Sequence, residues 1–176
     1  MSTSGRLTEV YGNAECICYH RGDKFIFMSD CHRGVGNGGD NFIKNRHIYM
    51  AALQYYYQRN FTYVELGDGD ELWENKRMGD IVRVHPEVFD LLETFERAGK
   101  LYMLYGNHDI QKKKETTFSG RLVREGLVLE EWETKRRIFL VHGHQGDVLN
   151  DRLWRIGRFL VRNFGATWRC SVWRIR

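Results

Sequence analysis

The sequence predicts a single α/β domain, and three observations support this prediction. Apolar runs of strand length alternate with segments whose apolar residues recur at helical spacing. Short glycine-containing turns separate these runs, without repeats or a proline-rich linker. Polar clusters directly follow several of the predicted strands, which is where open α/β sheets place their ligands. The chain has 176 residues, of which 42% are hydrophobic, so it is large enough to bury one core.

The elements are predicted in order along the chain. Residues 24–29 predict a buried strand, with which residues 16–20 could pair as a hairpin. Helical spacing predicts a crossover helix within residues 41–59, followed by a strand over 62–66 and a helix over 72–84. Pro86 begins another helix, which ends at Gly99. Further predictions are a strand over 101–105, a short helix after a basic linker, and a hairpin formed by 127–133 and 137–141.

Composition excludes several classes of protein. No stretch approaches the roughly 18 apolar residues that a membrane span needs, and the first residues lack a secretion signal. The four cysteines follow neither zinc-binding spacing nor a dense disulfide pattern, which favours reduced thiols. We therefore expect a cytoplasmic protein.

Charge divides the chain into two regions, residues 1–150 and residues 151–176. After Asp151 there are seven arginines and no acidic residue, whereas the preceding part carries slightly more acidic than basic residues. The basic region begins with helical spacing, which places Leu153, Ile156, Leu160 and Phe164 on one face, Arg155, Arg158 and Arg162 on another, and Trp154, Trp168 and Trp173 nearby. Such a helix could contact an anionic membrane surface or nucleic acid, or pack against other parts of the protein.

Two of the polar clusters carry carboxylates at predicted strand ends. Asp30-Cys31-His32 offers a carboxylate and an imidazole two residues apart, which point to the same side in an extended chain. Gly67-Asp68-Gly69-Asp70-Glu71 places carboxylates together on a flexible turn, where a cation would neutralise their repulsion. Taken alone, the first cluster could equally be a turn with a surface histidine, and the second an acidic turn that caps a helix.

The other two clusters carry imidazoles. Gly106-Asn107-His108-Asp109 combines an amide oxygen, an imidazole and a carboxylate that could orient it. His142-Gly143-His144 supplies two imidazoles after the predicted hairpin strand. Mixed imidazole, carboxylate and amide donors suit manganese, iron or zinc better than calcium.

These four motifs, in this order, resemble those of the calcineurin-like metallophosphoesterases. The resemblance covers about residues 24–147 and implies a four-layer α/β/β/α sandwich with a two-metal site at the strand ends. It implies that Asp30 and His32 bind one divalent ion, with Mn²⁺ as the first candidate and Fe or Zn as alternatives. It also implies that Asp68 bridges both ions, and that Asn107 and His142 bind the second.

The resemblance also implies the reaction, which is hydrolysis of a phosphate monoester or diester by a metal-activated hydroxide. His108, supported by Asp109, would act on the phosphoryl group or leaving alkoxide. Arg33 is a candidate phosphate contact, because its guanidinium matches phosphate oxygens. The expected substrates are phosphorylated small molecules, nucleotides or phosphoproteins, and we expect no stable nucleic-acid complex.

The chain departs from the family pattern at its end. The family closes its site with a further G-H-x-H motif, but no histidine follows His144. Two explanations compete: either the chain is truncated, or the site closes with other ligands such as His144 or Asp147. The pattern G-D-x-x-D-x-W is reminiscent of UDP-2,3-diacylglucosamine pyrophosphohydrolases, with Trp73 in place but Glu71 where an aspartate is expected.

Two other functions remain open alongside hydrolysis. The first is a catalytically impaired remnant that binds a metal or a phosphorylated ligand without turnover, as the missing motif would indicate. The second is binding of an anionic membrane surface or nucleic acid through the arginine-rich region 151–176, which would be strongly salt-dependent.

Overall fold

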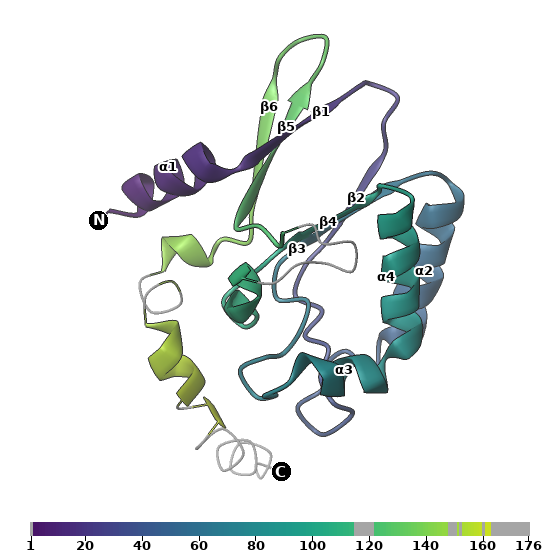
Figure 1. The fold of residues 1–176 in the computed structure, drawn as a ribbon, viewed down its shortest axis with the longest axis vertical. Coiled ribbons are helices and arrows are strands. Elements are labelled where there is room, and N and C mark those ends of the chain that lie inside the picture. Colours follow the sequence, from purple (N-terminus) through teal and green to yellow (C-terminus); the bar gives the residue numbers. More distant parts are fainter. Residues whose placement is uncertain (1, 115–121, 148–150, 152, 160, 163–176) are drawn as a thin grey trace, which may run out of the picture.

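The protein has a mixed α/β structure with two three-stranded sheets (Figure 1). The computed structural model describes residues 2–114, 122–147, 151, 153–159, 161 and 162. The first sheet is parallel throughout and has the order β2-β3-β4, with bounds Phe25–Met28, Thr62–Leu66 and Leu101–Leu104. The second has the order β1-β5-β6, with bounds Glu15–Tyr19, Gly126–Glu131 and Arg137–Val141. The predicted α/β class is therefore confirmed.

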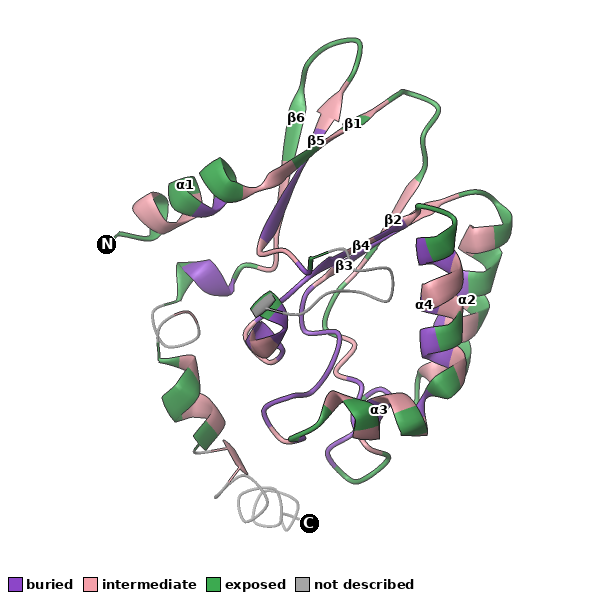
Figure 2. Cartoon of the chain, in the orientation of Figure 1, coloured by how far each residue is buried: buried purple, intermediate pink, exposed green. Residues whose placement is uncertain are grey.

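Helices α2 (Arg46–Gln58) and α4 (Pro86–Arg97) lie side by side against the first sheet, with α3 (Met78–Val84) beside its carboxyl ends (Figure 1). Pro86 starts α4 as predicted, where its missing N–H costs no hydrogen bond. The helix buries an apolar face at helical spacing, formed by Val88, Phe89, Leu92 and Phe95. Figure 2 shows this buried face turned toward the sheet. It forms the larger core together with residues of β3 and β4.

A second core lies between the two sheets. Val64 and Leu104 of the first sheet pack in one cluster with Leu127 and Leu129 of β5, and all four are almost fully buried. Side chains alternate along β3, so that Tyr63 belongs to the helix-side core while Val64 faces the second sheet. The two cores therefore hold a layer of helices and two layers of sheet together.

Helix α1 (Thr3–Asn13), which is not among the predicted elements, packs against the second sheet. Only Val10 of this helix is buried, which explains its weak sequence signal. Gly126 leaves room for it, because a Cβ there would lie 2.9 Å from Val10 Cγ1. The Tyr11 ring also meets the Phe139 ring edge-on at 5.2 Å.

The predicted strands are largely confirmed, but one predicted pairing is wrong. The strand over 62–66 has the predicted bounds, and β5 and β6 form the predicted antiparallel hairpin. However, residues 15–19 do not pair with β2. They form β1, which runs parallel to β5 instead. The turn at residues 20–23 carries the chain from one sheet to the other, and a local pattern cannot distinguish that course from a hairpin.

Two helices are shorter than predicted because side chains organise the loops before them. Helix α2 begins at Arg46 rather than within 41–45, where the Asp40 carboxylate accepts hydrogen bonds from the N–H groups of Phe42 and Ile43. Similarly, α3 begins only at Met78. The residues between 71 and 77 form turns that build the candidate site.

The basic region is helical over residues 154–159, but its orientation differs from the predicted one. Leu153 and Ile156, predicted to form an apolar face, are exposed, whereas Trp154 packs against the larger core. Leu160, Phe164, Trp168 and Trp173 lie outside the residues for which the structure describes side chains. No helix among the described residues has both the length and the apolar character needed to cross a bilayer.

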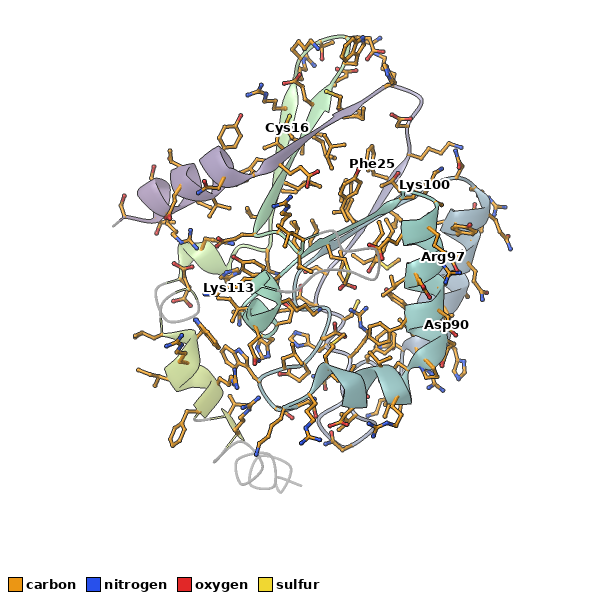
Figure 3. The ribbon with its side chains drawn as sticks, in the orientation of Figure 1. Cys16, Phe25, Asp90, Arg97, Lys100 and Lys113 are labelled. Atoms are coloured by element: carbon orange, nitrogen blue, oxygen red, sulfur yellow. The ribbon has the colours of Figure 1, made fainter. Side chains whose placement is uncertain are left out.

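The three cysteines that the structure describes differ in exposure. Cys16, labelled in Figure 3, and Cys18 are exposed on β1, and Cys31 is half-buried. All three are free thiols.

Candidate metal centre

The polar clusters converge because parallel strands end at the same edge of a sheet. Asp30 lies two residues beyond β2, and Asp68 two residues beyond β3. Backbone hydrogen bonds hold the two loops together, from Asp30 N–H to the Gly67 carbonyl and from His32 N–H to the Asp68 carbonyl at 2.9 Å. His142 comes from the second sheet, where it directly follows β6.

The backbone conformation and the close packing of the loops explain why the motifs contain glycine. Asp30, His32 and Asp68 all have positive φ angles, of 56°, 49° and 51°, a strained conformation that often occurs at functional sites. Gly67 has φ 97°, and a Cβ there would lie 2.9 Å from the His142 side chain. A Cβ at Gly106 would lie 2.8 Å from the Asp68 backbone nitrogen. The two glycines therefore let three loops approach one another closely.

Asp68 lies at the middle of the cluster. His142 Nε2 is 3.2 Å from Asp68 Oδ2, and His32 Nε2 is 4.0 Å from the same oxygen. His32 Nε2 is also 3.8 Å from Asp30 Oδ1. Donor atoms of Asp30, His32 and Asp68 all lie within 4.8 Å of one another, a spacing at which they could share one cation.

The hydrogen bonding of His142 suits a metal ligand. Its Nδ1 lies 3.0 Å from the Leu66 carbonyl oxygen and must donate to it, because that oxygen can only accept. In the neutral ring this donation fixes the tautomer and leaves the Nε2 lone pair directed toward Asp68. Backbone donors of this kind orient the imidazoles of many metal sites. The residues present therefore fit a divalent cation.

The carboxylates and imidazoles of the cluster shift one another's pKa values. Burial disfavours the ionised form of Asp68, but the hydrogen bond with His142, the charges of His142 and His108, and the His108 backbone N–H together lower the pKa of the carboxyl. Burial likewise opposes protonation of His142, whereas Asp68 raises its pKa. The pKa of His32 is raised chiefly by its hydrogen bond to Glu71. A bound cation would compete with these protons for the same donor atoms.

His108 faces Glu71 rather than Asp109. Its Nδ1 lies 2.8 Å from Glu71 Oε2, its ring stacks on Trp73 at 4.2 Å, and its backbone N–H donates to Asp68 Oδ1. The prediction that Asp109 supports the His108 ring is therefore wrong. Asp109 is fully buried, and its Oδ1 accepts the N–H groups of Gly106 and Asp68 instead, so that it holds the loop rather than the imidazole.

Glu71 is the main residue that sequence reasoning missed. Its Oε2 also lies 3.0 Å from His32 Nδ1, so one carboxylate orients two imidazoles. Burial opposes its ionisation, but the hydrogen bonds with His108 and His32 lower its pKa to about 2. The available signal was the acidic run after Asp68, which fits helix capping equally well. Glu71 Oε1 accepts a hydrogen bond from the Trp73 backbone N–H at 3.1 Å. These residues form a turn, however, and helix α3 begins only at Met78.

Arg33 is buried, and the prediction that it contacts a substrate phosphate is wrong. Its guanidinium is inaccessible to solvent and donates to both Glu65 oxygens at 2.8 Å and to Asp70 Oδ1 at 2.7 Å. Lys112 donates in turn to Asp70 and Asp109. This buried ion network connects the loops after β2, β3 and β4, and so fixes the positions of the candidate ligands.

His144 lies apart from the other predicted ligands. Its ring centroid is 5.7 Å from that of His142, and its donor atom groups with Glu125 and Asp151 rather than with Asp68. The separation arises because Gly143 has φ 109°, which breaks the extended geometry in which residues two apart share a side. Burial lowers the pKa of His144 to about 4, and its ring nitrogens have no hydrogen-bond partner among the described residues. Asp147, the other proposed closing ligand, is exposed after the 3-10 turn η2 (His144–Gly146).

Asn107 lies on the same turn as His108 and is half-buried. Its backbone carbonyl accepts the indole N–H of Trp73 at 2.6 Å. This hydrogen bond and the stacking on His108 fix the Trp73 ring as one wall of the centre. The ligand role of the Asn107 side chain stays a prediction.

No protein-family model, curated protein or solved structure matches this chain. The residues of the site and the motif resemblance therefore carry the proposal for its function.

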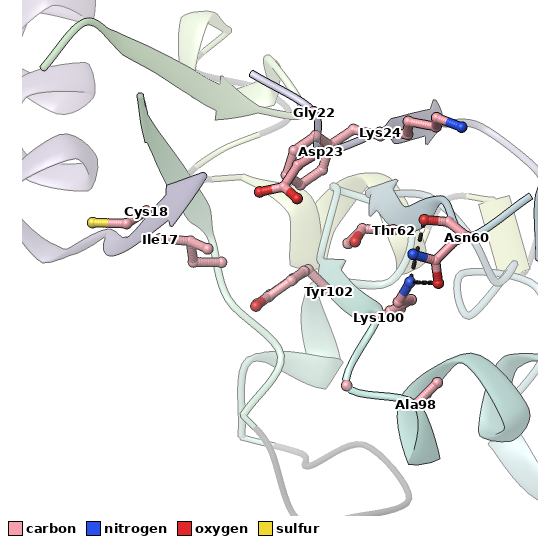
Figure 4. Close-up of a pocket in the computed structure, with 12 residues that line it drawn as sticks. Ile17, Cys18, Gly22, Asp23, Lys24, Asn60, Thr62, Ala98, Lys100 and Tyr102 are labelled. Atoms are coloured by element: carbon pink, nitrogen blue, oxygen red, sulfur yellow. Dashed lines mark hydrogen bonds between the residues drawn. The ribbon is translucent and has the colours of Figure 1, made fainter. Parts of the chain in front are cut away.

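A separate pocket of about 360 Å³ lies at the opposite edge of the first sheet (Figure 4). It is lined by residues at the starts of the strands, such as Phe25, Thr62 and Lys100. The Lys100 ammonium donates to the Asn60 backbone carbonyl at 3.2 Å and to the Asn60 side chain. Since the candidate ligands all follow strand ends, this pocket is not part of the metal centre.

Proposed function

We propose that this chain is a metal-dependent phosphoesterase that hydrolyses a phosphate monoester or diester with two divalent cations. One observation carries the proposal: Asp68 lies between His142 and His32, with Asp30 beside them, at the ends of separate strands. A purely structural ion pair would not require four ligand-type side chains from three loops at one edge. The four ordered motifs of the calcineurin-like metallophosphoesterases support the same function.

The layering is compatible with the four-layer α/β/β/α sandwich that the resemblance implies. Helices α2 and α4 cover the first sheet, and α1 packs against the second. In the proposed arrangement both sheets meet face to face, and the strand-end loops of each contribute ligands to one centre. His142 would be the contribution of the second sheet.

In the proposed site, Asp30, His32, Asp68 and His142 hold the cations, and Asn107 completes the set. When bound, divalent ions at such a centre supply a nucleophile from water near neutral pH and positive charge for the phosphoryl oxygens. Manganese is the first candidate, with iron and zinc as alternatives, because imidazole and carboxylate donors are mixed.

His108 is the proposed group that acts on the substrate. Its Nδ1 is held by Glu71, so its Nε2 is the nitrogen that can donate to a phosphoryl oxygen or to the departing alkoxide. Trp73 packs against the ring and restricts its rotation. The substrate class stays broad, because the ligand set does not discriminate among small phosphorylated molecules, nucleotides and phosphoproteins.

Metal stoichiometry tests the proposal most directly. The full chain is loaded with manganese, desalted and analysed for metal, and hydrolysis of p-nitrophenyl phosphate and bis(p-nitrophenyl) phosphate is then measured. We expect two ions per chain, and we expect Asp68→Asn to reduce metal content and to lower kcat by about 100-fold or more. Asp90→Asn, at an exposed position on α4 labelled in Figure 3, is the matched control and should leave both unchanged.

Two other results would contradict the proposal. Unchanged metal content and hydrolysis in Asp68→Asn would exclude this centre as the catalytic site. One tightly held ion and no hydrolysis would favour a metal-binding remnant, because Asp30, His32 and Asp68 alone offer enough donors for a single cation.

A further inference from the structure

A groove lined by basic side chains lies next to the proposed metal centre. We call it the basic groove; its volume is about 540 Å³, and its lining includes Lys113, Trp154, Arg155, Arg158, Phe159 and Arg162. Lys113, labelled in Figure 3, belongs to the 3-10 helix η1 (Ile110–Lys114), and the others belong to the basic region. The groove therefore forms where the loop after β4 meets the segment 154–162.

The charges of the groove are not balanced by nearby carboxylates. Among the residues that the structure describes, no carboxylate forms an ion pair with Lys113, Arg155 or Arg158, although many surface arginines elsewhere are paired. Burial and the neighbouring Arg162 lower the pKa of Arg158, which indicates mutual repulsion between the cations. Two guanidinium groups without a carboxylate partner attract anions. The planar arrangement of guanidinium N–H groups matches phosphate oxygens in particular.

Trp73 connects the groove to the metal centre. One face of its indole stacks on His108. On the groove side, Gly157 lies against the ring, since a Cβ there would be 3.1 Å from an indole carbon. Arg162 donates to the Trp73 carbonyl at 2.6 Å and to the Leu72 carbonyl at 3.0 Å. Trp73 thus contacts both His108 and the segment whose arginines line the basic groove.

We propose that the basic groove is a second phosphate subsite, so that the substrate is a small organic molecule with two phosphate groups, one at the metal centre and one in the groove. This inference rests on the proposed function, because it takes the metal centre as the site of hydrolysis. The volume of about 540 Å³ lies in the range of sites that bind small molecules. Trp154 and Phe159 provide apolar surface for the carbon skeleton between the phosphates.

The first experiment measures groove binding without metal. Adenosine 3′,5′-bisphosphate is titrated calorimetrically into the metal-free full chain and into Arg155→Gln/Arg158→Gln. We expect the double variant to bind about tenfold more weakly or worse, because it loses two charge-assisted contacts. Unchanged binding by the double variant would overturn the inference.

Arg59→Gln is the matched control for the double variant. Arg59 stacks over Tyr55 on α2, much as Arg155 and Arg158 lie over Trp154, but it is remote from the groove. Its replacement removes one positive charge, whereas the double variant removes two, and it should not weaken bisphosphate binding. Equal weakening by Arg59→Gln would show a general charge effect and would overturn the assignment to the groove.

The second experiment tests whether both subsites hold one molecule. In the manganese-loaded protein, adenosine 3′,5′-bisphosphate and adenosine 5′-monophosphate are compared as inhibitors of p-nitrophenyl phosphate hydrolysis. We expect the wild type to prefer the bisphosphate by about tenfold and the double variant to show almost no preference. Equal inhibition of the wild type would overturn the two-phosphate substrate.

The two experiments also separate the groove from the proposed function. If the manganese-loaded protein hydrolyses nothing while groove binding persists, the proposed phosphoesterase function is wrong and the substrate assignment falls with it. If hydrolysis is normal but groove binding is absent, only the second subsite is wrong.

Discussion

At the scale of single residues, Glu71 orients two of the imidazoles of the candidate centre. It is almost completely buried, and it contacts His32 and His108 through the same carboxylate. The first imidazole is a proposed metal ligand and the second the proposed acid. Glu71 is therefore a positioning residue for both, in the way that carboxylates commonly orient ligand imidazoles.

Replacing Glu71→Gln tests this role. The amide keeps the size of the side chain but cannot accept hydrogen bonds from both rings through two equivalent oxygens, so we expect kcat to fall by about 10–100-fold. Glu93→Gln, at a half-buried position on α4 where the carboxylate pairs with Arg97, is the control. The measurement is kcat and KM for p-nitrophenyl phosphate with manganese, together with metal content. Normal kcat in Glu71→Gln would show that the ring positions do not depend on it.

At the scale of structural elements, the buried ion network ties the loops of the site to one another. Lys112 of η1 reaches back to Asp70 after β3 and to Asp109 after β4, and Arg33 joins Asp70 to Glu65 inside β3. None of these side chains is more than a few per cent exposed. The strand-end loops are therefore held by these buried ion pairs in addition to their backbone hydrogen bonds.

Lys112→Met is expected to lower the free energy of unfolding by about 3–5 kcal/mol, because it leaves two buried carboxylates without their shared partner. Its neighbour Lys113 is exposed, and Lys113→Met should change stability by less than about 0.5 kcal/mol. Urea unfolding of the metal-free chains measures both values.

Adding Asp109→Asn to Lys112→Met should restore part of the loss, because one uncompensated charge is removed while Oδ1 can still accept the loop N–H groups. Equal stability of Lys112→Met and Lys113→Met would mean that the network does not hold the loops.

At the scale of the whole molecule, helix α1 is bonded to the start of the basic region. Arg6 of α1 donates to Asp151 at 3.0 Å and to Glu125, which precedes β5. The basic region is held at a second point by Arg162, through carbonyls beside the metal centre. The segment that forms one wall of the basic groove is thus anchored at both ends.

The pH dependence of unfolding is also a property of the whole molecule. Burial opposes ionisation of Asp40, but the Gly36 N–H and His85 lower its pKa, and the pKa of Asp70 is lowered by Arg33 and Lys112 against the same penalty. A carboxyl with a lowered folded pKa contributes stability above its unfolded pKa of about 4 and loses it as the pH falls through the folded value. Asp109, whose pKa burial raises, opposes this trend.

We therefore expect the metal-free protein to lose stability progressively below about pH 4. Asp40→Asn should be less stable than the wild type by about 1–3 kcal/mol near neutral pH, because it loses the carboxylate oxygen that lies 2.8 Å from His85 Nε2. This difference should shrink as the pH falls, which urea unfolding at a series of pH values measures. A difference that stays constant down to about pH 3 would exclude the ionised carboxylate as its cause. The exposed Asp90→Asn should show no such trend.

Much of the fold could be predicted because it is encoded locally. The bounds of β3, the Pro86 start of α4 and the hairpin of β5 and β6 depend on residues close together in the sequence. The pairing of β1 with β5 could not be predicted, because it joins segments about a hundred residues apart. The length of α2 was overestimated for a similar reason, since the Asp40 side chain replaces helical hydrogen bonds at its start.

For the candidate centre, the sequence by itself determined which residue types follow which strands, and hence that Asp30, His32, Asp68, His108 and His142 meet at one edge. Only the tertiary structure decided how each of them is held. Arg33 and Asp109 look like surface groups in the sequence, but long-range ion pairs and backbone contacts bury them. Glu71 became a partner of two imidazoles because the turn after Asp68 folds back beneath them. Local patterns specify the strands and turns, whereas burial and ion pairing depend on contacts between residues distant in the chain.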